Sequence, residues 1–186
     1  IQKQKILLRN ILINYKKHRC ELTMFKHRYS HFIDQLTFNN NEFIFLIDGR
    51  NIFYSTNTGT NNIDINKIKN YDKHINVYNN SIIDNMITKK IIHKNYKYNK
   101  QQIYLIFSES HANIINKLQL KNIFVMYSPK GINDDIIQLY LWLTYLGCIL
   151  ISNDKHSNYI SKINANQYFL GLLNDLKTKY QYTINI

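Results

Sequence analysis

The stretch FIFLID, residues 43–48, decides the fold. It is a short apolar run without polar alternation, it follows the polar residues NNNE, and it ends on a carboxylate. Such a run predicts a strand that is buried on both faces of a sheet. Three later runs have the same character: QIYLIFS at 102–108, IFVMYS at 123–128 and CILISN at 148–153. Four strands of this kind favour a parallel sheet with helices on both sides.

Helical segments separate these strands. Since strand and helix alternate, the fold class is α/β, a three-layer sandwich with a central, mostly parallel sheet. The polar and poorly periodic segment 54–79 is expected to be a loop or insertion without regular structure. The expected helices are 80–98, 111–120, 134–146 and one or two more within 155–178, and residues 182–186 are a candidate last strand.

The chain of 186 residues is long enough for one domain with a substantial core. Its hydrophobic fraction of 45% excludes a disordered tail. Residues 1–41 mix apolar positions with lysine and arginine, and we interpret them as a basic helical connector or flank. Residues 42–186 form the predicted domain. Because the sequence begins with isoleucine, we expect it to be a piece of a longer protein.

The charge favours a polyanionic partner. The formal net charge is +12, and residues 1–30 carry eight basic side chains against one acid. Basic runs interleaved with tyrosines suit RNA, although the same pattern is compatible with a solvated basic face. Tyr96 and Tyr98 are candidate stacking residues. The expected RNA-binding side chains are Lys89, Lys90, Lys94, Lys97 and Lys130.

The cysteines and the apolar stretches exclude some classes of protein. Cys20 and Cys148 lie far apart and form no CxxC pair, so neither a disulfide framework nor a zinc knuckle is indicated. The longest apolar stretch, 136–151, is too short for a membrane span and is expected to belong to the core. We therefore expect an intracellular protein without membrane contact.

Four aspartates are predicted to meet at one edge of the sheet. Asp48 ends the first strand, and Asp154 follows the fourth. Asp134 and Asp135, in the sequence SPKGINDDIIQLYLW at 128–142, open the helix before the fourth strand. The carboxyl ends of parallel strands and the adjacent helix N-termini line one crevice. A third of the 12 acidic residues is thus expected there.

Packed carboxylates repel one another unless cations neutralise them. Divalent ions with oxygen ligands, Mg²⁺ above all, suit this arrangement. Two such ions beside a basic surface favour metal-assisted hydrolysis of a phosphodiester.

Each acid also has a simpler interpretation. Asp134 is compatible with helix capping, Asp48 with a turn before Gly49, and Asp154 with a cap for a following helix. Neighbouring residues on a helix diverge, so one of Asp134 and Asp135 can approach an ion while the other caps. The coincidence of all four on one predicted rim favours the metal site.

The sequences FLIDGRN and SPKGINDDIIQLYLWLTYLGCILISND resemble the metallonuclease domain of proteinaceous ribonuclease P, a branch of the NYN group within the PIN-like nucleases. The resemblance runs from about Phe43 to the end of the chain. Members have an IDGAN-like strand end, a P-x-G-x-N-D-D loop before an apolar helix and an LLVTND-like strand end. Order, spacing and strand context together carry the resemblance.

The resemblance implies a function. Asp48, Asp134, Asp135 and Asp154 correspond to the metal-coordinating aspartates of the family. It implies two Mg²⁺ or Mn²⁺ ions and removal of the 5′ leader from precursor tRNA. Asn51 and Asn133 match polar motif positions that orient ligands or substrate. RNA-binding helical repeats are expected upstream in the same chain, and a mitochondrion, plastid or nucleus is the expected compartment.

The sequence departs from the family pattern in three places. Arg50 stands where the family usually has alanine, so a cation adjoins the first aspartate and can contact phosphate or weaken metal binding. The family histidine after the last aspartate aligns with Tyr159, and His156 is the nearest histidine. A set of cysteines and histidine matching the family's zinc connector is missing from the sequence.

Two alternatives follow from these departures. One is a non-catalytic RNA-binding or structural module that kept the nuclease fold, and the other is a PIN-like nuclease acting on another RNA. The remaining histidines are expected at the surface: His18, His27, His31, His74, His93 and His111. Trp142, Tyr140 and Tyr145 are expected in the core.

Overall fold

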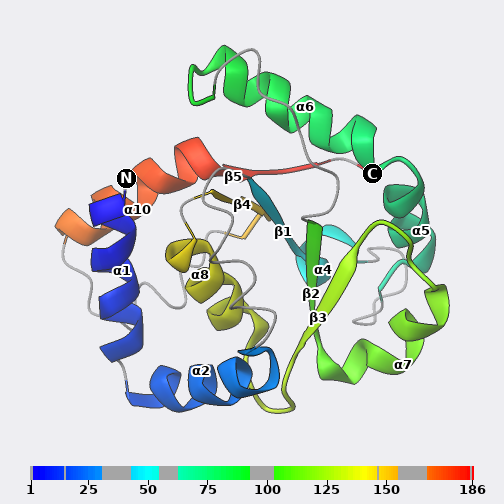
Figure 1. Ribbon diagram of the computed structural model, residues 1–186, viewed down its shortest axis with the longest axis horizontal. Coiled ribbons are helices and arrows are strands. Elements are labelled where there is room, and N and C mark those ends of the chain that lie inside the picture. Colours follow the sequence, from blue (N-terminus) through cyan, green and yellow to red (C-terminus); the bar gives the residue numbers. More distant parts are fainter. Residues whose placement is uncertain are drawn as a thin grey trace.

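Strand β1 (Ile44–Asp48) forms the middle of a five-stranded sheet. The computed structural model describes residues 2–14, 16–30, 43–54, 63–92, 103–145, 147–154, 167–184 and 186 (Figure 1). The strand order is β3-β2-β1-β4-β5, and every neighbouring pair is parallel. The other strands are β2 (Ile103–Ser108), β3 (Phe124–Ser128), β4 (Cys148–Ile151) and β5 (Gln181–Tyr182). All four predicted apolar runs are strands. The last strand, predicted at 182–186, is only Gln181–Tyr182, and residues 183, 184 and 186 lie outside it.

Each face of the sheet has its own apolar core. Ile44 and Leu46 of β1 point into one core, whereas Phe45 and Ile47 point into the other. The first core is covered by α1 (Gln2–Asn14), α2 (Lys16–Arg28), α8 (Asp134–Thr144) and α10 (Gln167–Tyr180). The second is covered by α4 (Gly49–Ile52), α5 (Ile65–Lys73), α6 (Ile75–Thr88) and α7 (Ala112–Ile115). The predicted three-layer α/β sandwich is therefore confirmed.

The interpretation of 54–79 as a loop is wrong for the described part of that segment. Asp64 caps α5 by accepting hydrogen bonds from the amides of Asn66 and Lys67. The buried residues of α5, Ile68 and Tyr71, are three positions apart on one face, but the helix has only nine residues and so offers a short pattern among the surrounding Asn and Lys. Helix α6 then begins at Ile75 instead of residue 80 and ends at Thr88.

Two other helices also differ from expectation. In place of one helix at 111–120, the chain forms three short elements: η1 (Glu109–His111), α7 and η2 (Asn116–Leu118). Helix α10 begins at Gln167, within the segment 155–178 where one or two helices are predicted. Residues 155–166 lie outside the described part of the chain.

The first helices pack into the same core as α8. Leu8 and Leu12 of α1 and Leu22 and Phe25 of α2 are buried there. The Nζ of Lys5 donates hydrogen bonds of 2.8 Å to the carbonyls of Trp142 and Tyr145 at the end of α8. A cation at this end suits the helix dipole. Burial lowers the pKa of Lys5 to about 8. The boundary at residue 42 stays a prediction, but α1 and α2 share one core with the sheet.

Gly49 makes the sharp passage from β1 into α4 possible. A Cβ at this position would lie 2.6 Å from the carbonyl oxygen of Ile106 and 2.6 Å from the Phe107 ring. The carbonyl belongs to β2, the neighbouring strand, so it has little freedom to move away. The glycine in FLIDGRN therefore serves close packing of α4 on β2 directly after Asp48.

We expect Gly49→Ala to lower the free energy of unfolding by about 1–3 kcal/mol, because the added methyl overpacks the contact with β2. Gly171→Ala is the matched control. Gly171 lies within α10 with no atom within 4 Å of its added Cβ. The control should gain about 0.5–1 kcal/mol from helix propensity. Urea denaturation measures both changes, and equal effects of the two substitutions would contradict the packing argument.

Candidate active site

The chain reverses its course across the sheet at β1. From β1 it proceeds to β2 and β3 on one side, and α8 then crosses back to β4 on the other side. The carboxyl ends of β1 and β4 therefore flank a topological switch point, where open α/β sheets bind ligands. Asp48 is the last residue of β1, and Asp154 follows β4 by three residues.

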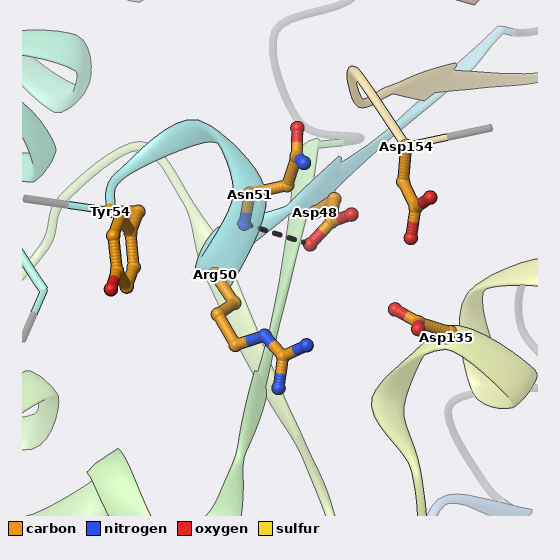
Figure 2. A pocket seen from close by; sticks show the side chains of 6 residues that line it. All are labelled: Asp48, Arg50, Asn51, Tyr54, Asp135 and Asp154. Carbon is orange, nitrogen blue, oxygen red and sulfur yellow. Dashed lines mark hydrogen bonds between the residues drawn. The ribbon is translucent and has the colours of Figure 1, made fainter. Parts of the chain in front are cut away.

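A pocket of about 220 Å³ opens at this switch point. Figure 2 shows the carboxylates of Asp48, Asp135 and Asp154 facing one another across it, from β1, α8 and the chain after β4. The remaining lining residues are Arg50, Asn51 and Tyr54. Asp134 is buried beside this pocket and does not line it. The structure thus brings the four predicted aspartates together.

Asp48 is held by two hydrogen bonds. Its Oδ1 accepts from the amide of Asn51 at 3.1 Å, which caps α4, and its Oδ2 accepts from the Ser152 hydroxyl at 2.7 Å. The same hydroxyl accepts from the amide of Asp154 at 3.0 Å. The amide of Asn153 donates to the side chain of Asn51 at 2.7 Å. These bonds join the ends of β1 and β4 and fix two carboxylates relative to each other.

Asn133 takes the capping role that was considered for Asp134. Its Oδ1 accepts from the amide of Asp135 at 2.9 Å and caps α8. In the part of the chain that the structure describes, the buried Oδ2 of Asp134 accepts no hydrogen bond. A buried carboxylate oxygen without a donor is costly, and a cation is one partner that relieves the cost.

The carboxylates raise one another's proton affinity. Burial raises the pKa of Asp48, the hydrogen bonds from Ser152 and Asn51 oppose that rise, and Asp134 adds to it. Burial together with the charges of Asp134, Asp48 and Asp154 raises the pKa of Asp135 to about 7, and Arg50 opposes this. The pocket is therefore a site where negative charge is concentrated and only partly compensated.

The donor set suits a hard divalent cation. The converging ligand atoms are carboxylate oxygens, which Mg²⁺ and Mn²⁺ bind and which softer metals do not select. Among the described residues, no three Asp, Glu, His or Cys side chains are spaced closely enough to hold one ion together. The arrangement fits an ion bound by one or two carboxylates with water completing the shell, as Mg²⁺ prefers. The ligand roles of the four aspartates stay predictions.

Three residues at this rim escaped sequence reasoning. Ser152 follows a buried strand as a small hydroxyl residue, a signal that in retrospect marks a strand end near the site. Tyr54 lines the pocket. His111, expected at the surface, is half-buried, and its ring meets Phe107 edge-on at a centroid distance of 6.0 Å. Burial lowers the pKa of His111, whereas Asp134 raises it and Arg50 lowers it, so both charges act at this position.

Of the predicted RNA-binding lysines, the structure describes Lys89, Lys90 and Lys130, and these three are not among the residues that line the pocket. Lys89 and Lys90 follow α6 and are exposed, and Lys89 donates to the carbonyl of Thr178 at 3.3 Å. Lys130 is exposed in the loop before α8, where its amide donates to Glu109 at 2.9 Å. Their RNA contacts stay predictions. Lys94, Lys97, His156, Tyr96 and Tyr98 lie outside the described residues.

An all-parallel, five-stranded sheet covered by helices on both faces is consistent with a PIN/NYN-like nuclease fold. A solved structure of nuclear protein-only RNase P 2 (PRORP2) of Arabidopsis thaliana aligns with 97% of this chain at a TM-score of 0.52 and 17% identity. The chain spans about a third of that protein, 34% of its length. A second solved structure of PRORP2 aligns with 92% of this chain, at a TM-score of 0.47 and 16% identity. The aligned part is 33% of the length of that PRORP2 chain.

No family model and no curated protein matches the sequence. In the ranges that the structure describes, no helix is both long and apolar enough to cross a bilayer. What the solved structures establish is the fold.

The raised pKa of Asp135 predicts that the free energy of unfolding depends on pH. Between its ordinary value of 3.8 and about 7, the folded protein holds a proton that the unfolded chain has released, so stability falls as pH rises through this window. At about pH 8 in EDTA, Asp135→Asn should raise the free energy of unfolding by roughly 1 kcal/mol, less than the full shift implies because the group is partly exposed.

This gain should vanish towards pH 4, as measured by urea denaturation across pH. Asp84→Asn, at an exposed position of α6, is the control and should show no such dependence. A gain that is constant across pH would contradict the electrostatic origin.

Proposed function

We propose that this chain is the nuclease domain of a metal-dependent endoribonuclease that removes 5′ leaders from precursor tRNA, as in protein-only ribonuclease P. The observation that carries the proposal is the convergence of Asp48, Asp135 and Asp154 on one pocket, with Asp134 buried beside them. The fold shared with PRORP2 and the motifs FLIDGRN and PKGINDD support it. The net charge of +12 suits an RNA partner.

The reaction is hydrolysis of a phosphodiester, in which water attacks phosphorus, the 3′ oxygen of the leader departs and the tRNA keeps a 5′-phosphate. Bound Mg²⁺ or Mn²⁺, in one or two ions, would activate water and stabilise the leaving oxygen. Asp48, Asp134, Asp135 and Asp154 are the residues that would hold these ions.

The chain's own contribution is to position the carboxylates. Ser152 and Asn51 fix the orientation of Asp48. Asn133 caps α8, so the carboxylates of Asp134 and Asp135 are not needed for capping. Among the pocket-lining side chains of the described residues, none is an activated serine, threonine or cysteine. This composition agrees with direct attack by water, without a covalent enzyme intermediate.

A second candidate is a non-catalytic RNA-binding module with the same fold. Two observations favour it: the carboxylates of the described residues are not spaced for joint direct binding of one ion, and Arg50 places a competing cation in their pocket. Against it, a scaffold gains nothing from four acids that raise one another's pKa.

The deciding experiment incubates the full-length protein with 5′-labelled precursor tRNA in Mg²⁺. We expect cleavage at the mature 5′ end, abolished by EDTA. Asp134→Asn and Asp135→Asn should each reduce the rate on the order of a hundredfold or more, because each removes a charge from the metal-binding set. Gel analysis of the labelled products measures position and rate.

Asp84→Asn is the matched control and should cleave like the unmodified protein, since Asp84 is exposed on α6. Cleavage elsewhere in the RNA would favour a PIN-like nuclease with another substrate. Tight, salt-sensitive tRNA binding without cleavage would favour the non-catalytic module.

A further inference from the structure

Arg50 lines the pocket and pairs with no acidic side chain among the residues that the structure describes. It extends from α4, the helix that Asp48 caps, and its exposed side chain lines the same pocket as the three carboxylates (Figure 2). Within the described ranges, Arg28 forms an ion pair with Glu109 at 3.3 Å. Arg50 forms neither an ion pair nor a side-chain hydrogen bond with a described residue. The guanidinium therefore keeps its five N–H donors available.

The position of Arg50 is nevertheless electrostatically coupled to the site. Its charge lowers the pKa of Asp135 and of His111, although among the described residues it forms an ion pair with no carboxylate. A guanidinium whose sole task was to neutralise the aspartates would gain most by closing onto one of them in a bidentate pair. Arg50 instead faces the space where a ligand of the pocket would lie.

A ligand of this pocket must bind beside both the positive charge of Arg50 and the negative charges of the carboxylates. A phosphodiester strand does so, because a phosphate oxygen can accept the planar fork of Arg50 while the carboxylates stay with their cations. Tyr54 lines the same pocket, four residues further along the chain, and Figure 2 shows it on the side of Arg50 that faces away from Asp135 and Asp154. An aromatic ring next to a phosphate-binding cation is the usual composition of a single-stranded nucleotide site.

We propose that Arg50 and Tyr54 form a nucleotide subsite next to the carboxylates, in which Arg50 binds one backbone phosphate and Tyr54 stacks on the adjoining base. The ligand class is single-stranded RNA or an unpaired RNA end. The inference rests on the proposed function for the placement of this nucleotide beside the cleaved bond, but the binding itself requires no cleavage.

The test compares proteins by RNA binding, measured apart from turnover. Fluorescence anisotropy with a labelled single-stranded RNA of roughly ten nucleotides, in Ca²⁺ to neutralise the carboxylates, measures the affinity of the unmodified full-length protein, Arg50→Ala, Arg50→Lys and Tyr54→Leu. Lys69→Ala, at an exposed position of α5, is the matched control for loss of one positive charge. Each variant is first checked for an unchanged unfolding midpoint.

We expect Arg50→Ala to weaken binding on the order of tenfold and to reduce the slope of affinity against salt by about one unit. Arg50→Lys should recover part of the loss, since it keeps the charge without the planar fork. Tyr54→Leu should weaken binding several-fold with little change in the salt slope, and Lys69→Ala should leave affinity almost unchanged.

A series of RNAs with one neutral methylphosphonate at successive positions identifies the phosphate. The effect of Arg50→Ala should disappear for one position of the series and persist for the others. Unchanged affinity of Arg50→Ala, or a loss that is equal across the whole series, would overturn the subsite. If Arg50 instead only offsets carboxylate repulsion, its alanine variant would bind RNA normally and unfold more readily at about pH 8 in EDTA.

The binding result is independent of the nuclease result. If the protein cleaves no precursor tRNA but shows the position-specific effect of Arg50→Ala, the subsite stands and the proposed function is wrong. A protein that cleaves in Mg²⁺ with unchanged KM in Arg50→Ala would retain the function and lose the subsite.

Discussion

Burial of β1 on both of its faces is the constraint on which the rest of the structure depends. Alternate side chains of this strand enter different cores, so the chain must supply helices on each side of it. Both edges of the strand are hydrogen-bonded to parallel neighbours, β2 and β4. With β1 in the middle, the chain adds strands first on one side of β1 and then on the other. This change of direction creates a crevice at the carboxyl end of β1, where Asp48 lies.

The same burial sets the electrostatic character of the site. Asp48 ends a strand that is wholly inside the protein, and its carboxylate is only 2% exposed. Water screens its charge poorly there, and each further acid at the rim adds to the repulsion. The surrounding framework keeps the acids in place against this repulsion, chiefly through Ser152 between Asp48 and the Asp154 amide. Raised pKa values of this kind, as at Asp48 and Asp135, are typical of functional sites.

The sequence predicts those features whose signal is strong and local. The runs that become β1, β2, β3 and β4 are continuous and apolar, because both faces of a central parallel strand are buried. The placement of the aspartates at strand and helix ends then follows from topology alone. Helix α5 escaped prediction because it has only nine residues, and its apolar positions stand in a stretch that is otherwise Asn, Lys and Asp. Contacts between distant residues also left no local signal, as with Ser152 and Asp48, 104 residues apart.

The buried Lys5 has a practical consequence for dividing the chain. Sequence composition suggests trimming at residue 42, because everything before it looks like a basic appendage. Such a shortened protein would present to solvent the apolar side of α8 that α1 and α2 cover, and the carbonyls of Trp142 and Tyr145 would lose the hydrogen bonds from Lys5. It would be prone to aggregate, with the helix that bears Asp134 and Asp135 anchored at one end only. Expression of this nuclease-like fold should therefore begin no later than α1.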